Sequence, residues 1–96
     1  MELKWTQINS NENHFLEQAW EDYLYWQAND LRCLERIHLI LKEVCRTPFQ
    51  GIGKPEALKH VLKGYWSRRI NSEHRFVYRI MDGSLFIAQM RYHYEK

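Results

Sequence analysis

Residues 64–94 read GYWSRRINSEHRFVYRIMDGSLFIAQMRYHY, and this stretch decides how the rest of the chain is arranged. Aromatic, β-branched and cationic residues gather there in three runs separated by turn-forming residues, a pattern typical of strands. The runs are Tyr65–Ile70, Arg75–Ile80 and Ser84–Tyr92. Because short turns join consecutive runs, the stretch predicts a three-stranded antiparallel meander.

The length of the second turn sets which side chains share a face, since a slip of one residue moves every side chain to the opposite face. A two-residue turn at Asp82-Gly83 would place Phe76 on the same face as Gln89 and mix core with polar residues. We therefore favour a three-residue loop, 81–83, in which Gly83 is left-handed. This register predicts an apolar face of Phe76, Tyr78, Ile80, Phe86, Ala88 and Met90. The opposite, open face would carry Arg75, Val77, Arg79, Gln89, Arg91 and His93, with Ser67 and Arg69 from the first run.

Composition indicates one compact domain over residues 1–96, because 45% of the residues are hydrophobic and 27% are charged. The net charge of +2 conceals an imbalance along the chain. Residues 1–30 hold one Lys or Arg and six Asp or Glu, whereas residues 31–70 hold nine and three. The middle of the chain could therefore bind a polyanion, although ordinary solvation of helix faces explains the imbalance equally well.

The two cysteines, Cys33 and Cys45, fall in one predicted helix about 18 Å apart along its axis, so they cannot pair within it. Neither belongs to a metal-ligand spacing, and a reducing compartment is therefore expected. The amino terminus is no signal peptide, and no apolar run reaches membrane-spanning length. We expect a cytoplasmic protein with no membrane partner.

Before the meander, periodicity predicts a short strand at residues 2–8, a polar turn at residues 9–13 that offers N-caps, and then two helices. Their apolar stripes are Phe15, Leu16, Ala19, Trp20, Tyr23 and Trp26, followed by Leu34, Ile37, Leu41 and Val44. Asp30 is expected to cap the second helix, and Thr47-Pro48 to end it. The expected class is α+β in the order β-α-α-β-β-β, with both helices on one face of an antiparallel sheet. Trp5, Trp20, Trp26 and Trp66 are interpreted as core residues.

The open face carries the groups needed to cleave RNA without a metal: a base, an acid and cations that stabilise charge on phosphorus. Histidine is the residue type suited to proton transfer near neutral pH, so His93 is the natural proton donor. Glu56, after the glycine-rich loop 49–55, could accept one, and Arg75 could bind a phosphate through two donors. Arginines on an exposed strand face mostly provide solubility, so Arg79 and Arg91 are interpreted as structural.

Four segments together strongly resemble the YoeB toxins of the Txe/YoeB branch of the RelE superfamily. They are WEDYLYWQAND (20–30), RTPFQGIGKPEALKH (46–60), GYWSRRINSEHRFVYRI (64–80) and RYHY (91–94). The resemblance implies a RelE-like, microbial-RNase-like fold and a ribosome-dependent mRNA interferase that cuts messenger RNA at the A-site codon. It also implies a homodimer, a YefM-type antitoxin as partner, an antitoxin complex that binds operator DNA, and no cofactor.

Family roles can be assigned to individual residues by the same resemblance. Glu56 would deprotonate the ribose 2′-hydroxyl, His93 would protonate the leaving oxygen, and Arg75 would stabilise the phosphorane. Tyr94 completes this catalytic set. Supporting RNA-binding positions are Lys59, Arg69 and Glu73, the last of which could orient one of the arginines. The expected products are a 2′,3′-cyclic phosphate or 3′-phosphate and a 5′-hydroxyl.

Two features depart from the family pattern. Additional residues lie between the expected first strand and WEDYLYW, within residues 7–18, and should lengthen the first helix or the loop before it. Glu95-Lys96 also follow Tyr94, where the family tends to end. Two other functions remain open: a non-catalytic nucleic-acid-binding partner of an antitoxin, and a small structural dimer module.

Overall fold

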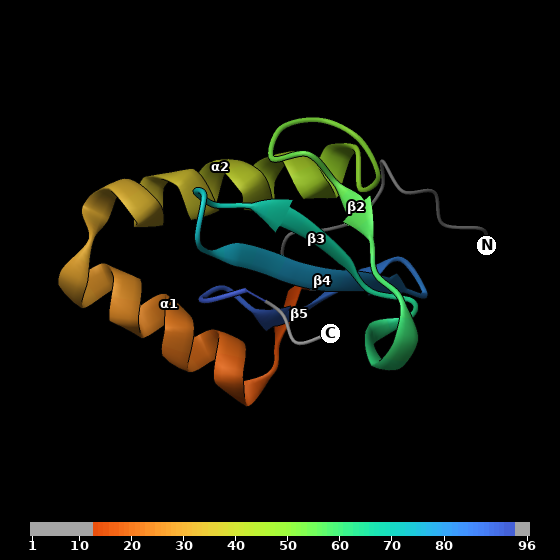
Figure 1. Ribbon diagram of the computed structural model, residues 1–96, viewed down its shortest axis with the longest axis horizontal. Helices are drawn as coiled ribbons and strands as arrows, with labels where there is room; N and C mark the ends of the chain where they lie inside the picture. The colour runs from red at the N-terminus through yellow and green to blue at the C-terminus, as the bar shows by residue number, and fades with distance from the viewer. Residues whose placement is uncertain (1–12, 94–96) are drawn as a thin grey trace.

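The computed structural model describes residues 13–93, in which two helices pack against a five-stranded sheet (Figure 1). The elements are β1 (Asn13–Phe15), α1 (Glu17–Asn29), α2 (Leu31–Arg46), β2 (Glu56–Ala57), the 3₁₀ turn η3 (His60–Leu62), β3 (Trp66–Arg69), β4 (Arg75–Met81) and β5 (Ser84–Gln89). The expected strand at residues 2–8 and Trp5 lie outside the described residues. Within residues 13–93, no helix has the length and apolar character needed to cross a membrane.

The sheet order is β1-β5-β4-β3-β2, and the predicted meander forms its centre as three antiparallel strands. At one edge β1 pairs with β5 in parallel, which corrects the assignment of Asn13 to a polar turn. Because α1 begins at Glu17, two residues after β1 ends, no inserted segment separates this strand from the first helix. The expected insertion within residues 7–18 was counted from the strand expected at residues 2–8, which lies outside the described residues, so it stays a prediction. Leu16 occupies the N-cap position of α1 without a side-chain hydrogen bond, so the expected polar N-cap candidates were wrong.

The register between β4 and β5 differs from the expected one. Met81 pairs with Ser84, so the connection is the two-residue turn Asp82-Gly83, with φ of 52° and 78°. These paired positive angles match a type I′ turn, whose twist suits a hairpin. A register shift then follows, because Tyr78 is opposite Ile87 while Val77 is opposite Gln89.

This irregularity leaves one residue of β5, Ala88, without a partner and reverses the alternation of the chain beyond it. Between the turn and the bulge, the two-residue turn pairs Leu85 with Ile80 and Ile87 with Tyr78. Leu85 and Ile87, rather than Phe86 and Ala88, therefore face the core, and both are 0% exposed. After the bulge the predicted parity returns: Gln89 shares the open face with Val77, and Met90 is buried. The bulge therefore allows a two-residue turn while the apolar and polar side chains still lie on opposite faces of the sheet.

One core joins the two helices to one face of the sheet. Its buried members are Ala19, Trp26, Cys33, Ile37, Ile40, Val44, Ile70, Phe76, Tyr78, Leu85, Ile87 and Met90. Trp26 belongs to this core as expected, and Trp66 packs against it, whereas Trp20 is 49% exposed on α1. Trp20 lies outside the core because the buried face of α1 runs through Ala19, Asp22 and Trp26. Cys33 and Cys45 are both free, as their shared helix requires.

Asp30 caps α2 as predicted, and its Oδ1 accepts hydrogen bonds from the backbone N–H groups of Cys33 and Arg32. These bonds, that of Cys33 first, lower the pKa of the Asp30 carboxyl below its ordinary value of 3.8. A lowered folded-state pKa means that the ionised cap stabilises the fold above pH 3.8. That stabilisation is lost as the pH falls through the folded-state pKa.

We therefore expect Asp30→Ala to lower the melting temperature at neutral pH and to differ less from the wild-type chain at pH values below 3.8. Thermal unfolding followed by circular dichroism measures both effects. Asp30→Asn is the control, because an amide oxygen caps the helix without titrating. An Asp30→Ala deficit that stays constant at all pH values would contradict the assigned role of the ionised cap.

Candidate active site

Glu56 lies in β2, a two-residue strand at the edge of the sheet, and its side chain is exposed. The strand pairing places it opposite Ser67 of β3, which is opposite Val77 of β4. Directly paired residues point to the same face of a sheet. Glu56 therefore projects from the open face, the face opposite the two helices.

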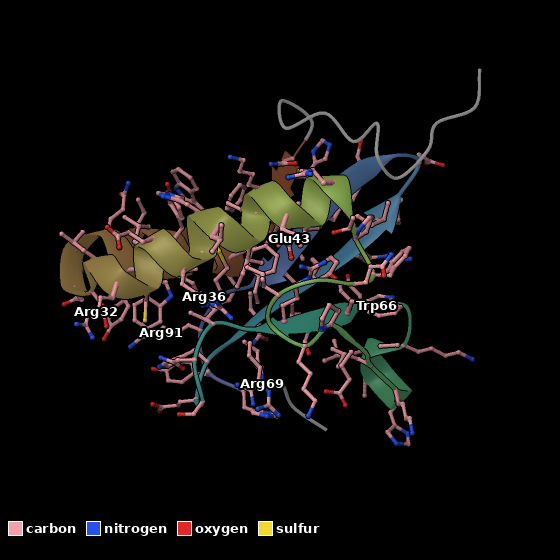
Figure 2. The ribbon with its side chains drawn as sticks, turned by 90° about the horizontal axis from the view of Figure 1, so that it is seen from above. Arg32, Arg36, Glu43, Trp66, Arg69 and Arg91 are labelled. Carbon is pink, nitrogen blue, oxygen red and sulfur yellow. The ribbon has the colours of Figure 1, made fainter. Side chains whose placement is uncertain are left out.

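Arg68 points to the other face, where it is 0% exposed, and it fastens the loop that leads to Glu56. Its guanidinium donates to the carbonyl oxygens of Thr47, Gln50 (2.9 Å) and Ile52 (3.2 Å), to Glu43 Oε1 (3.3 Å) and to the Tyr78 hydroxyl (3.3 Å). Figure 2 shows Glu43 on the side of α2 that faces the sheet. One buried cation thus joins α2, β4 and the loop 47–52 to β3.

Two further contacts complete this attachment. Burial raises the pKa of the Tyr78 phenol, so its hydroxyl keeps its proton and donates to the carbonyl of Pro48. Gly51 has a φ of 122°, and a Cβ at this position would lie 2.1 Å from Glu43 Oε1. Only glycine therefore lets the loop pass this closely over the Glu43–Arg68 ion pair.

Arg69 and Arg75 are directly opposite each other in β3 and β4, on the open face. Arg75 is 8% exposed, and its Nη1 donates to the carbonyls of the preceding turn, at Asn71 (3.0 Å), Ser72 (3.2 Å) and His74 (3.2 Å). Arg69 is exposed on the far side of β3 from α2 (Figure 2). Within residues 13–93 neither guanidinium forms an ion pair with a carboxylate. Two like charges on opposed residues repel each other, and an anion between them relieves that repulsion.

The carboxyl-terminal residues reach the same end of the sheet by a bend. The sequence predicted that the last strand would extend to Tyr92, but β5 ends at Gln89. The Arg75 backbone N–H then donates to the Tyr92 carbonyl at 3.0 Å. His93 directly follows this bonded residue and is exposed. Tyr94 lies outside the described residues.

The supporting positions are distributed unequally around this site. Lys59 is exposed immediately before η3. Glu73 is exposed in the turn between β3 and β4, and its Oε1 lies 3.6 Å from Nε2 of His74 rather than beside an arginine. Arg79 and Arg91 lie over tyrosine rings, Arg91 at 3.4 Å from the Tyr25 centroid, which agrees with a structural role.

The strand pairing brings Glu56, Arg69 and Arg75 together on one face. Strands lie about 5 Å apart and same-face neighbours about 7 Å apart, which places these three Cα atoms within about 12 Å of one another. The bonded Tyr92 carbonyl brings His93 to the Arg75 end of the group. A glutamate, two arginines and a histidine therefore come from neighbouring positions at one end of the open face.

Sequence reasoning missed three residues that support the segments carrying this site: Arg68, Asp22 and His74. Arg68 had a usable signal, because alternation in β3 places it on the core face, where a charged residue requires buried partners. Asp22 had one as well, since helical spacing puts it between Ala19 and Trp26. His74 carried no comparable signal, because its contacts come from α1 and from the carboxyl-terminal bend.

The chain is similar to known proteins in both sequence and fold. Residues 15–94 match the family described as the YoeB-like toxin of bacterial type II toxin-antitoxin systems. The YoeB toxin of Escherichia coli O6:H1 is 59% identical over 78 residues, which cover 81% of this chain and 93% of that toxin. The YoeB toxin of a Synechocystis species is 57% identical over 82 residues, which cover 85% of this chain and 95% of that toxin.

Solved structures agree in fold as well as in sequence. The YoeB/ParE toxin from Agrobacterium tumefaciens superposes with a TM-score of 0.83 at 47% identity, covering 86% of this chain and 99% of that one. The YoeB dimer from Staphylococcus aureus has a TM-score of 0.81 at 49% identity, with 86% and 97% covered. The heterotetrameric YoeB–YefM complex from the same organism has a TM-score of 0.80 at 49% identity, with 85% and 95% covered. The chain therefore belongs to the YoeB-like toxins of bacterial type II toxin-antitoxin systems, within the RelE superfamily.

Proposed function

We propose that this toxin is a ribosome-dependent endoribonuclease that cleaves messenger RNA at the A-site codon. The observation that carries the proposal is the opposed pair Arg69 and Arg75, beside the exposed carboxylate of Glu56. A phosphodiester between the two guanidinium groups accepts hydrogen bonds from both and relieves their repulsion. A carboxylate within reach of the same phosphodiester is suited to proton transfer rather than to binding the anion.

The reaction uses groups of the chain alone. Glu56 accepts the proton of the ribose 2′-hydroxyl while the 2′-oxygen bonds to phosphorus. The bond from phosphorus to the 5′-oxygen breaks, and His93 donates the proton that this leaving oxygen takes up. Arg75 stabilises the additional negative charge on the phosphorane, and its three carbonyl partners hold it in place beforehand. The products are a 2′,3′-cyclic phosphate and a 5′-hydroxyl.

The remaining predicted site residues take supporting roles in this proposal. Lys59 and Arg69 bind phosphates of the RNA backbone as exposed cations. Glu73 acts on the site through His74, because its carboxylate lies beside that ring. Tyr94, which follows the proton donor in sequence, completes the proposed catalytic set.

The test adds purified, antitoxin-free protein to bacterial ribosomes programmed with a defined messenger RNA, and to the same RNA without ribosomes. Primer extension maps the cut ends. We expect cuts at the A-site codon in the presence of ribosomes and none on naked RNA. Absence of cuts in both mixtures, from folded protein that still binds ribosomes, would contradict the proposal and favour a non-catalytic nucleic-acid-binding partner of an antitoxin.

Relatives of known structure support a proposal for the partners. The Staphylococcus aureus relatives form a YoeB dimer and a YoeB–YefM heterotetramer. We propose that this chain likewise forms a homodimer, binds a YefM-type antitoxin in the cytoplasm, and binds operator DNA as part of that complex. The excess of Lys and Arg in residues 31–70 provides positive charge that would attract DNA, RNA or an acidic antitoxin segment.

A further inference from the structure

Hydrogen bonds to other elements hold the bend between the last strand and His93, and within the bend Gln89 Nε2 donates to the carbonyls of Arg91 (2.9 Å) and Tyr92 (3.4 Å). Asp22 Oδ2, buried on α1, accepts from the Met90 backbone N–H at 2.9 Å, and Trp26 Nε1 donates to the Met90 carbonyl at 2.8 Å. Tyr92 is held on both sides: its carbonyl accepts from the Arg75 N–H at 3.0 Å, and its own N–H donates to His74 Nδ1 at 2.7 Å. The chain thus reaches His93 through residues fixed by α1, β4 and the turn before β4.

Tyr92 needs such support because its backbone is in an unfavourable conformation. Its φ is 65°, in the left-handed region that residues with a Cβ seldom adopt. A residue holds this conformation only where surrounding contacts impose it. The Tyr92 side chain is 55% exposed, so burial of the ring does not explain the conformation. Hydrogen bonds of the Tyr92 backbone support it instead. The carbonyl accepts from the Arg75 N–H and from Gln89 Nε2 (3.4 Å), and the N–H donates to a single side chain, His74.

The surroundings of His74 define its tautomer and its orientation. A backbone N–H can only donate, so Nδ1 carries a lone pair and the ring proton is on Nε2, 3.6 Å from Glu73 Oε1. The edge of the ring packs against Trp26, with centroids 4.9 Å apart and planes at 78°. Its side chain is 12% exposed. The imidazole is therefore held with one acceptor atom directed at Tyr92.

We propose that His74 is a positioning residue that places His93 for proton transfer by holding the Tyr92 backbone through Nδ1. This inference rests on the proposed nuclease function, because His93 is the proton donor of that reaction. Rotation about the Tyr92 backbone moves His93 directly, since one peptide bond joins them. A proton donor must lie within about 3 Å of its acceptor, and a misplacement of about 1 Å lowers a rate by about a hundredfold.

Two amide variants separate the hydrogen bond from the bulk of the ring. In His74→Asn the side-chain oxygen occupies the place of Nδ1 and can accept from Tyr92, whereas in His74→Gln the amide reaches the place of Nε2 instead. We expect His74→Asn to keep kcat on programmed ribosomes within about threefold of the wild-type value. His74→Gln should lose at least about tenfold in kcat while its KM for ribosomes changes less than about twofold. A role limited to stability would reduce the activity of both variants in proportion to their melting temperatures.

A measurement on the wild-type protein tests the tether without relying on activity. NMR should detect a scalar coupling across the hydrogen bond between the Tyr92 amide nitrogen and His74 Nδ1. The absence of this coupling would overturn the proposal even if His74→Gln failed to fold. Equal kcat values for both variants would overturn it as well. Failure of the proposed function looks different, because the wild-type chain would then leave RNA uncut while the coupling persisted.

Discussion

A His93→Gln variant is expected to cleave ribosome-bound messenger RNA about 10²- to 10⁴-fold more slowly than the wild-type chain, because it lacks the proton donor for the leaving 5′-oxygen. Glutamine keeps a polar side chain of similar reach at an exposed position, so folding and ribosome binding should be retained. The loss should therefore appear in kcat and leave KM nearly unchanged. Single-turnover cleavage on programmed ribosomes measures the rate. Residual activity within tenfold of wild type would remove His93 from the reaction.

The matched control is His38→Gln, which changes an exposed histidine on α2, on the opposite side of the sheet from the site. Its rate should equal that of the wild-type chain. A modified RNA separates the acid from the base: with sulfur in place of the leaving 5′-oxygen, departure needs no proton. Such an RNA should restore cleavage by His93→Gln and leave Glu56→Gln inactive. If this RNA instead restored cleavage by Glu56→Gln, Glu56 would be the proton donor and His93 the base.

An Arg68→Met variant is expected to lose about 3–5 kcal/mol in the free energy of unfolding, because it removes the cation at the centre of a buried network. The carbonyls of Thr47, Gln50 and Ile52 would lose their partner, and Glu43 would lose its ion pair. For a domain whose total stability is about 5–15 kcal/mol, this loss is severe. Denaturant unfolding of the wild-type and variant chains measures it. Cleavage should fall with it, since the same network holds the loop before Glu56.

The neighbouring arginine provides the control. Arg69→Met changes an exposed residue on the opposite face of the same strand, so its unfolding free energy should stay within about 0.5 kcal/mol of wild type. It should weaken RNA binding instead, because Arg69 faces the proposed phosphate. Arg68→Met should therefore lower the free energy of unfolding, whereas Arg69→Met should weaken RNA binding. Arg68→Met with near wild-type stability would show that the buried network contributes little.

In the hairpin of β4 and β5, alternation predicted the buried side chains of one strand but not those of the other. Alternation in β4 placed Phe76 and Tyr78 in the core and Arg75 on the open face, as the structure has them. The same reasoning failed in β5, where it buried Phe86 in place of Leu85. A local pattern cannot reveal a bulge, because the extra residue is accommodated by packing against other elements rather than by its own sequence.

The sequence likewise predicted some features of the candidate site but not others. The open-face position of Arg69 and Arg75 follows from alternation. The roles of Glu56 and His93 were suggested by the chemistry of their side chains and assigned by resemblance to a family. Their approach to one another depends on contacts between distant segments, such as the Arg75 N–H with the Tyr92 carbonyl. Such contacts carry no periodic signal, since neither partner's neighbours in the chain indicate the other.

By itself the sequence determined the two helices, the Asp30 cap of the second helix, the central meander, the sign of the charge on the open face and the family to which the chain belongs. These properties depend on side-chain period, turn chemistry and short motifs, all of which are local. Only the tertiary structure decided that β1 pairs in parallel beside β5, that Arg68 is buried against Glu43, and that His74 holds the chain before His93. Each of these is a contact between groups far apart in the chain. Buried polar groups must form hydrogen bonds with one another because packing has excluded water, and the sequence alone does not show which groups are packed together.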